Sequence, residues 1–75
     1  MNVTVKLIGP LIRLAGFEER EVRLPADARA GDVLDHAGIP RARPTIVTRN
    51  GHAVGAGDAI AEGDRIVVSP IYSGG

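Results

Sequence analysis

The sequence ends in Ser73-Gly74-Gly75, and the group there that could do chemistry is the terminal carboxylate. Glycine is costly to order, at roughly 1–2 kcal/mol of backbone entropy per residue, so two in a row poorly suit the end of a stable fold. They suit a slim arm that enters a narrow channel of another protein. A terminal carboxylate, with a pKa of about 3.5, is an unreactive anion until it is activated. Joined to AMP, it would be open to attack by sulfide, a persulfide or an amine.

The other residue types that carry chemistry give weaker signals. His36 and His52 are the only histidines, and neither is accompanied by cysteine or a matching carboxylate cluster, so we interpret both as solvated. The absence of cysteine excludes disulfides, thiolate zinc sites and thiol catalysis. The glycine-rich stretch 55–58 ends in Asp58, which would repel phosphate, and it predicts a turn. We therefore expect no catalytic side chain, no metal site and no bound cofactor.

Length and composition narrow the class of protein. A chain of 75 residues forms one domain and has little room for a deep catalytic cleft. Nine basic residues balance nine acidic ones, which gives no nucleic-acid-binding footprint. No apolar run approaches the ~20 residues that span a membrane, and the first residues do not read as a signal peptide. A small domain without disulfides fits a cytoplasmic location.

Two alternating runs at the start predict a pair of strands. Val3, Val5 and Leu7 share one face of residues 2–8, and Val22 and Leu24 point inward from residues 19–25. Residues 11–16 between them predict a short helical turn closed by glycine. The two strands are expected to pair as an antiparallel hairpin.

The middle of the chain changes to a helical period. Residues 28–38 place one apolar stripe at i, i+3, i+4 and i+7, formed by Ala30, Val33, Leu34 and Ala37. Gly38 suits the C-terminal cap, and Pro40 prevents continuation. Gly31 weakens this short helix, so it must pack against a sheet.

The last third predicts three more strands. Residues 45–51 run into Asn50-Gly51, a strong hairpin signal, and residues 52–54 return. Residues 64–71 are rich in β-branched side chains and predict a central strand, in which Pro70 marks the loss of a partner. Ile60 is expected to be buried in the turn-rich segment before it. Placing the first and last strands side by side makes them parallel, with the helix on one face of the sheet.

This order predicts an α+β protein of the β-grasp, or ubiquitin-like, architecture. We expect a mixed sheet of four to five strands with one main helix packed on one face. Residues 1–71 would form the domain and residues 72–75 a flexible C-terminal tail.

The last strand is expected to present an apolar outer face. Ile66 and Val68 should face the helix, while Val67, Ser69 and Ile71 alternate away from it. Ile8 is expected to join them across the sheet. Apolar groups beside a reactive tail predict a partner-docking patch that continues into Tyr72 and Ser73. The alternative is a second small core beneath residues 10–16.

Four stretches together resemble the sulfur-carrier branch of the ubiquitin-like proteins, the MoaD/ThiS family. They are GPLIRLAG, ARAGDVLDHAGI, VTRNGHAV and EGDRIVVSPIYSGG, and the resemblance spans the whole chain. The first stretch is more similar to the MoaD side. Arg29 departs from relatives that often carry a threonine helix cap, so the cap is expected from Asp27 or Asp32.

The resemblance implies a cycle in which this protein is carrier and substrate rather than enzyme. A partner of the ubiquitin-activating type would use ATP to adenylate Gly75, and a sulfur donor would supply the sulfur for a C-terminal thiocarboxylate. Gly74 and Gly75 would be the working part. The thiocarboxylate would then deliver sulfur inside a synthase. Molybdopterin synthase, through its large subunit, ranks first and thiazole synthase of thiamine biosynthesis ranks second.

Two other functions stay open. In one, the protein is a ubiquitin-like modifier joined through Gly75 to lysines of other proteins. Because Lys6 is the only lysine, a homopolymer could then grow only through Lys6 or the Met1 amino group. In the other, the chain is a plain β-grasp binding module without tail chemistry, and its terminal glycines are a frayed end.

Overall fold

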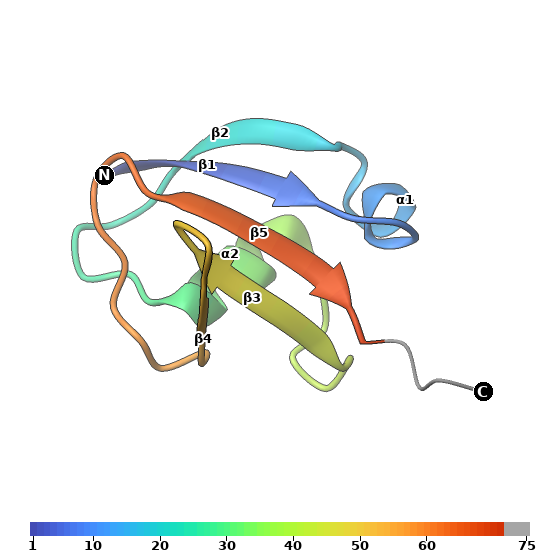
Figure 1. The fold of residues 1–75 in the computed structure, drawn as a ribbon. Helices are drawn as coiled ribbons and strands as arrows, with labels where there is room; N and C mark the ends of the chain where they lie inside the picture. The colour runs from blue at the N-terminus through green and yellow to red at the C-terminus, as the bar shows by residue number, and fades with distance from the viewer. Residues whose placement is uncertain (72–75) are drawn as a thin grey trace.

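The five strands found in residues 1–71, which are the residues that the computed structural model describes, form one mixed sheet (Figure 1). They are β1 (Asn2–Leu7), β2 (Glu19–Arg23), β3 (Thr45–Arg49), β4 (His52–Val54) and β5 (Arg65–Pro70). Their order across the sheet is β2-β1-β5-β3-β4, and β1 runs parallel to β5 at its centre. The predicted central pair is therefore confirmed, and the tail, residues 72–75, lies outside the described residues.

One face of the sheet is covered by helix α2 (Ala30–Ala37), which lies behind β5 and β3 in Figure 1. The whole predicted stripe of this helix is buried: Ala30, Val33, Leu34 and Ala37. The inward side chains of β1 and β5 meet the stripe: Val3, Val5, Leu7, Ile66 and Val68. Ile60 is also buried, as expected. The core thus lies between α2 and the inner face of the sheet.

A short helix and a tight turn connect the two antiparallel strand pairs. β1 and β2 are antiparallel and are joined through the short helix α1 (Leu11–Ala15), which Gly16 closes at a φ of 86°. β3 and β4 are antiparallel around Asn50 and Gly51, whose φ angles are 51° and 87°. Positive φ at both positions is what a type I′ hairpin turn requires, and asparagine followed by glycine tolerates it best. Both predicted hairpins are confirmed.

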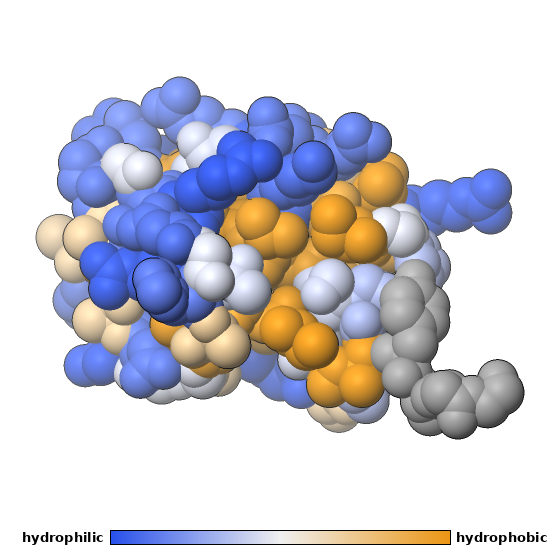
Figure 2. Space-filling view, viewed as in Figure 1, coloured by the Kyte–Doolittle hydropathy of each residue, from blue (hydrophilic) through white to orange (hydrophobic). Residues whose placement is uncertain are grey.

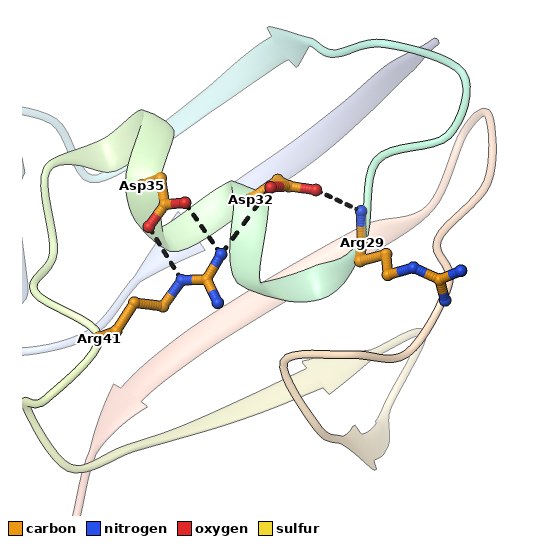
Figure 3. A network of polar contacts seen from close by, with 4 residues as sticks. All are labelled: Arg29, Asp32, Asp35 and Arg41. Carbon is orange, nitrogen blue, oxygen red and sulfur yellow. Dashed lines mark hydrogen bonds and ion pairs between the residues drawn. The ribbon is translucent and has the colours of Figure 1, made fainter.

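The start of α2 is capped by Asp32, one of the two acids expected to do so. Its carboxylate accepts a hydrogen bond of 2.7 Å from the Arg29 amide, as in the reach-back half of a capping box (Figure 3). The Arg29 side chain points away and donates to the Gly57 carbonyl at 2.8 Å. Arg29 therefore ties the helix start to the loop before β5 in place of capping it.

Gly31 leaves space inside α2 for the end of the Arg41 side chain, a flexible group that a larger residue would displace. The Arg41 guanidinium makes two hydrogen bonds of 2.9 Å to Asp35 and lies directly over Gly31 (Figure 3). A Cβ at residue 31 would meet its Nη1 atom at 2.5 Å, closer than real Cβ atoms approach. The hydrogen bond from Arg41 lowers the pKa of Asp35. The glycine that weakens the isolated helix thus makes room for this ion pair.

Pro70 ends the pairing of β5 on one side only. Toward β1 the last pair in register is Leu7 with Val68, and the Ile8 amide donates to the Val68 carbonyl at 3.0 Å. Backbone groups two residues apart point the same way in a strand, so the proline nitrogen faces the side where β1 has ended. On the β3 side, the prediction that β5 loses its partner at Pro70 is wrong, because Pro70 still pairs with Thr45 of β3.

Candidate functional site

The predicted site divides between the tail and the end of β5. Tyr72, Ser73, Gly74 and Gly75 lie outside the described residues, so their roles stay predictions. Ile71 is the last described residue, and 52% of it is exposed directly after β5. The described part of the chain therefore ends at an exposed residue directly after β5.

The alternation predicted for β5 is confirmed. Ile66 and Val68 are completely buried beneath the sheet, whereas Val67 and Ser69 are half-buried on the opposite face. Ile8 is half-buried too, and its amide bonds to β5. The three apolar residues predicted to form a docking patch thus lie on or directly after the two central strands: Val67 within β5, Ile8 just after β1 and Ile71 just after β5.

β3 adds one apolar side chain to this surface that sequence reasoning missed. Ile46 pairs with Ser69 across β3 and β5 and is 46% exposed. We define the outer face as Ile8, Ile46, Val67, Ser69 and Ile71, and Figure 2 shows apolar surface near the middle of this side of the molecule. The alternation of β3 could have predicted that Ile46 points outward, because its neighbour Val47 is an inward, buried residue. Only the strand register brings Ile46 to β5.

Helix α1 does not bury this surface. Its Leu11 is completely buried in the main core, and Ile12 packs against the same core. Leu14 remains 45% exposed. Within residues 1–71, the buried residues form one core that includes neither Ile8 nor Val67, so the alternative of a second small core beneath residues 10–16 is wrong.

Charged residues lie beside the outer face on the β1 and β2 side. Lys6 pairs in register with Val67 on β5 and with Glu19 on β2. The Glu19 carboxylate is engaged elsewhere, because it forms an ion pair of 3.0 Å with Arg65. Lys6 therefore stands next to the apolar surface while its cross-strand carboxylate neutralises a different cation.

A buried carboxylate just before β5 links the end of β3 and the β3–β4 turn to the start of β5. Asp64 accepts hydrogen bonds from the Arg49 and Asn50 side chains and from the Ala61 amide. Burial alone would raise its pKa, but these hydrogen bonds outweigh burial and hold the pKa of Asp64 below its usual value. Asn50 in turn exchanges two hydrogen bonds of 2.8 Å with the backbone of Arg65. This cluster fixes the β3–β4 turn against the start of the strand that carries the outer face.

A groove of about 410 Å³ lies on the helix side of the sheet. Its wall includes Leu34 of α2, Arg41 and Arg43 of the following loop, Val54 of β4, and Ile71. Ile71 therefore contributes both to the outer face and to this groove. Sequence reasoning did not identify the groove, because its wall is assembled from segments far apart in the chain.

Residues 1–71 hold neither a candidate metal site nor a candidate membrane-spanning helix. No group of three or more His, Cys, Asp or Glu side chains there is arranged to hold a metal ion. Neither helix in that part of the chain has the length and apolar character needed to cross a membrane.

Comparison with known proteins identifies the family. Residues 5–75 match the model of the ThiS family. Small archaeal modifier protein 1 of Haloferax volcanii is 33% identical over an alignment of 86 residues, which covers 93% of this chain and 97% of that protein. A crystal structure of the Haloferax volcanii modifier superposes with a TM-score of 0.81 at 30% identity, with both chains covered completely.

Two bacterial or archaeal structures with other names share the fold. The putative molybdopterin converting factor subunit 1 of Pyrococcus furiosus superposes with a TM-score of 0.79 at 23% identity, covering 96% of this chain and 99% of that one. Subunit 1 of the molybdopterin-converting factor of Helicobacter pylori, in a complex with subunit 2, superposes with a TM-score of 0.65 at 20% identity. The superposition covers all of this chain and all of that one. The β-grasp prediction is confirmed, and the chain belongs to the ThiS family of small ubiquitin-like carrier and modifier proteins.

Proposed function

We propose that this protein is a sulfur carrier whose working group is the Gly75 carboxylate. The observation that carries the proposal is the Gly74-Gly75 end, four residues beyond an exposed apolar face. The match to the ThiS family extends through residue 75, which supports the terminal glycines as part of the family pattern. The described side chains contribute docking and position, and the chemistry takes place at the end of the chain.

The proposed reaction has two steps. An adenylating enzyme of the ubiquitin-activating type joins the Gly75 carboxylate to AMP, with ATP as the donor and pyrophosphate as the leaving group. Hydrosulfide from a sulfur donor then attacks the acyl carbon, the bond to AMP breaks, and a proton is released. The product is a C-terminal thiocarboxylate, in which sulfur has replaced one oxygen.

The length of the tail limits the distance between the outer face and the ATP site of the adenylating enzyme. Four extended residues reach at most about 14 Å, so the ATP site of the partner must lie within that distance of Ile71. An enzyme this close must cover the end of β5, where Val67, Ile71 and Ile46 are exposed or half-buried. Burying such apolar side chains stabilises an interface by roughly 25 cal/mol per Å². We therefore assign the outer face to this partner.

The receiving synthase would use the same arm in turn. The Helicobacter pylori relative is, by its title, in a complex with a second subunit of the molybdopterin-converting factor. By analogy, we propose a molybdopterin synthase large subunit as the first candidate acceptor and a thiazole synthase as the second. The domain would bind no cofactor of its own, because ATP is consumed in the active site of the partner.

The test of activation is isotope exchange between pyrophosphate and ATP. With the adenylating enzyme encoded by the same organism, the full chain should stimulate incorporation of labelled pyrophosphate into ATP in proportion to its concentration. The exchange should be lost when the Gly75 carboxylate is blocked as an amide. A carboxyl-amidated chain that supports the same exchange would exclude activation at Gly75.

Val67→Asp is predicted to abolish docking while the domain stays folded. Val67 is half-buried on the outer face and is not part of the core, so a carboxylate there remains hydrated in the free protein but is dehydrated in the complex. The Kd for the adenylating enzyme, measured by calorimetry, should rise at least tenfold. Ala42→Asp is the matched control, since it adds the same charge to an exposed residue of the helix-side groove.

The two variants should give distinct signatures. Ala42→Asp should bind within about twofold of the unmodified protein. If Val67→Asp instead unfolds the domain, Val67 is a core residue and the assignment of the outer face is wrong. If Ala42→Asp loses binding and Val67→Asp does not, the partner occupies the groove on the helix side.

A second candidate function is protein modification. It is favoured by the 33% identity to a protein named small archaeal modifier protein 1. Both functions begin with the same acyl-adenylate, but here a lysine amine replaces hydrosulfide as the nucleophile. Digested cell extracts would then contain lysines that carry the C-terminal residues of this chain through an amide bond, and deleting Gly75 should remove every such conjugate.

A further inference from the structure

Only two groups in this sequence are amines that an activated carboxylate could acylate, one within β1 and one on the residue just before it. One is the side chain of Lys6, and the other is the Met1 amino group. The other cationic side chains are arginines, whose guanidinium groups stay protonated and are poor nucleophiles. The Met1 amino group donates to the Leu24 carbonyl at 2.6 Å, beside the edge strand β2. In Figure 1 the N-terminus lies at the end of the sheet opposite the C-terminal end of β5.

Lys6 lies near the C-terminal end of β1, next to the outer face. It lies directly between Glu19 on β2 and Val67 on β5. The Glu19 carboxylate pairs with Arg65 at 3.0 Å, and none of the ion pairs found within residues 1–71 includes Lys6. Among the residues that the structure describes, no carboxylate therefore sequesters its amine. A long lysine side chain also lies readily along neighbouring apolar groups, here Val67, with its charged end in water.

We propose that Lys6 is an acylation site and that an acyl group on it closes the outer face to the adenylating enzyme. The identity of the acyl donor rests on the proposed function: it is the Gly75 acyl-adenylate of a second copy of this chain. The neutral Lys6 amine attacks the acyl carbon and a carbon–nitrogen bond forms. The bond to AMP breaks, AMP leaves, and the amine proton passes to solvent. The product is an amide that joins the two copies.

The consequence follows from the position of Lys6 rather than from the acyl donor. Acylation replaces a hydrated cation with a neutral amide and adds atoms directly beside Val67, where the partner must approach within contact distance. Even an acetyl group changes both charge and shape there, and a whole second domain covers the face. An acylated copy would therefore keep its own Gly75 but lose the surface that presents it. Acylation and activation of one copy exclude each other.

The experiment for closure uses acetyl-lysine inserted at position 6 during synthesis, so that no other group is modified. Its Kd for the adenylating enzyme should be at least tenfold weaker than that of the unmodified chain. The matched control is the same chain acetylated on the Met1 amino group, which carries an identical added group at the opposite end of β1 and should bind within twofold. Circular dichroism and thermal unfolding should show the same fold for both proteins.

Two results would overturn the proposal, and neither depends on sulfur transfer. Acetyl-lysine at position 6 that binds within twofold of the unmodified chain would show that Lys6 lies outside the contact. An equal loss of affinity in both acetylated proteins would remove the link to the outer face. Calorimetric binding requires no adenylation, so these outcomes remain readable even if Gly75 proves not to be activated.

A second measurement concerns the acyl donor. Incubating the protein with ATP and the adenylating enzyme, with no sulfur source, should yield a dimer whose digest contains Lys6 linked to Gly75. Lys6→Arg, which keeps the charge and removes the nucleophile, should give no such dimer. Dimers that persist in Lys6→Arg, or a link mapped only to Met1, would contradict the assignment of Lys6.

Discussion

A chain that lacks Gly75, or that carries one extra residue after it, will not be adenylated, although it folds like the full chain. The reason is geometric, because the active site of the partner must meet the carboxylate at a fixed distance from the docked outer face. Pyrophosphate exchange should fall to background in both variants. The buried core found in the described residues ends at Val68, so the free energy of unfolding should change by less than about 0.5 kcal/mol.

Gly74→Val supplies a graded control for the same prediction. It keeps the number of residues and the terminal carboxylate, but a β-branched side chain restricts the backbone and narrows the clearance in a channel. Exchange should be reduced but measurable, with unchanged stability. Full exchange by the chain without Gly75 would assign activation to another group. Retained cellular function in that variant would favour the plain β-grasp binding module.

The largest loss of stability is expected from Asp64→Ala. This change removes the acceptor of three hydrogen bonds, from the Arg49 guanidinium, the Asn50 side-chain NH2 group and the Ala61 amide. Because the Arg49 side chain is 38% exposed and can be rehydrated, we expect a loss of about 2–3 kcal/mol, less than a fully buried pair would show. Urea unfolding at pH 7 measures it. Asp27→Ala, which removes an exposed carboxylate, should stay within about 0.5 kcal/mol.

The difference in the free energy of unfolding between Asp64→Ala and the wild-type chain should also depend on pH. The pKa of Asp64 is lowered in the folded state, so its charged form stabilises the fold above the unfolded value of about 3.9. That contribution disappears as the pH falls through the lower, folded pKa. The stability gap between the two proteins should therefore be constant from pH 7 to about pH 5 and shrink below pH 4. A gap that stays constant down to pH 2 would show that the carboxylate charge has no part in it.

Much of the fold could be predicted because its signals are local. Alternation assigned Val67 and Ile66 to opposite faces before any register was known, and Asn50-Gly51 defined its own turn. The stripe on α2 required only the helical period. The parallel arrangement of β1 and β5 followed from their β-branched composition together with the one main helix between them. The outward positions of Val67 and Ser69 on β5 could be predicted from the alternation of that strand.

The parts that were missed depend on contacts between distant segments. Ile46 joins the outer face only because its register places it opposite Ser69. Asp64 looks like an ordinary turn residue until β3 brings Arg49 to it. At Pro70, β5 is still paired with β3, although its pairing with β1 has ended at Val68. In each case the sequence around the residue is unremarkable, and the property belongs to the pairing of strands.

The most direct test of the central claim is the mass of the C-terminal fragment after a complete reaction. The protein is incubated with its adenylating enzyme, ATP and a sulfur source, then digested, and the fragment ions are sequenced. Conversion to a sulfur carrier predicts one sulfur-for-oxygen exchange, located on Gly75 and absent when ATP is omitted. An unchanged Gly75 in a preparation that still sustains the cellular function, or sulfur located on any other residue, would contradict it.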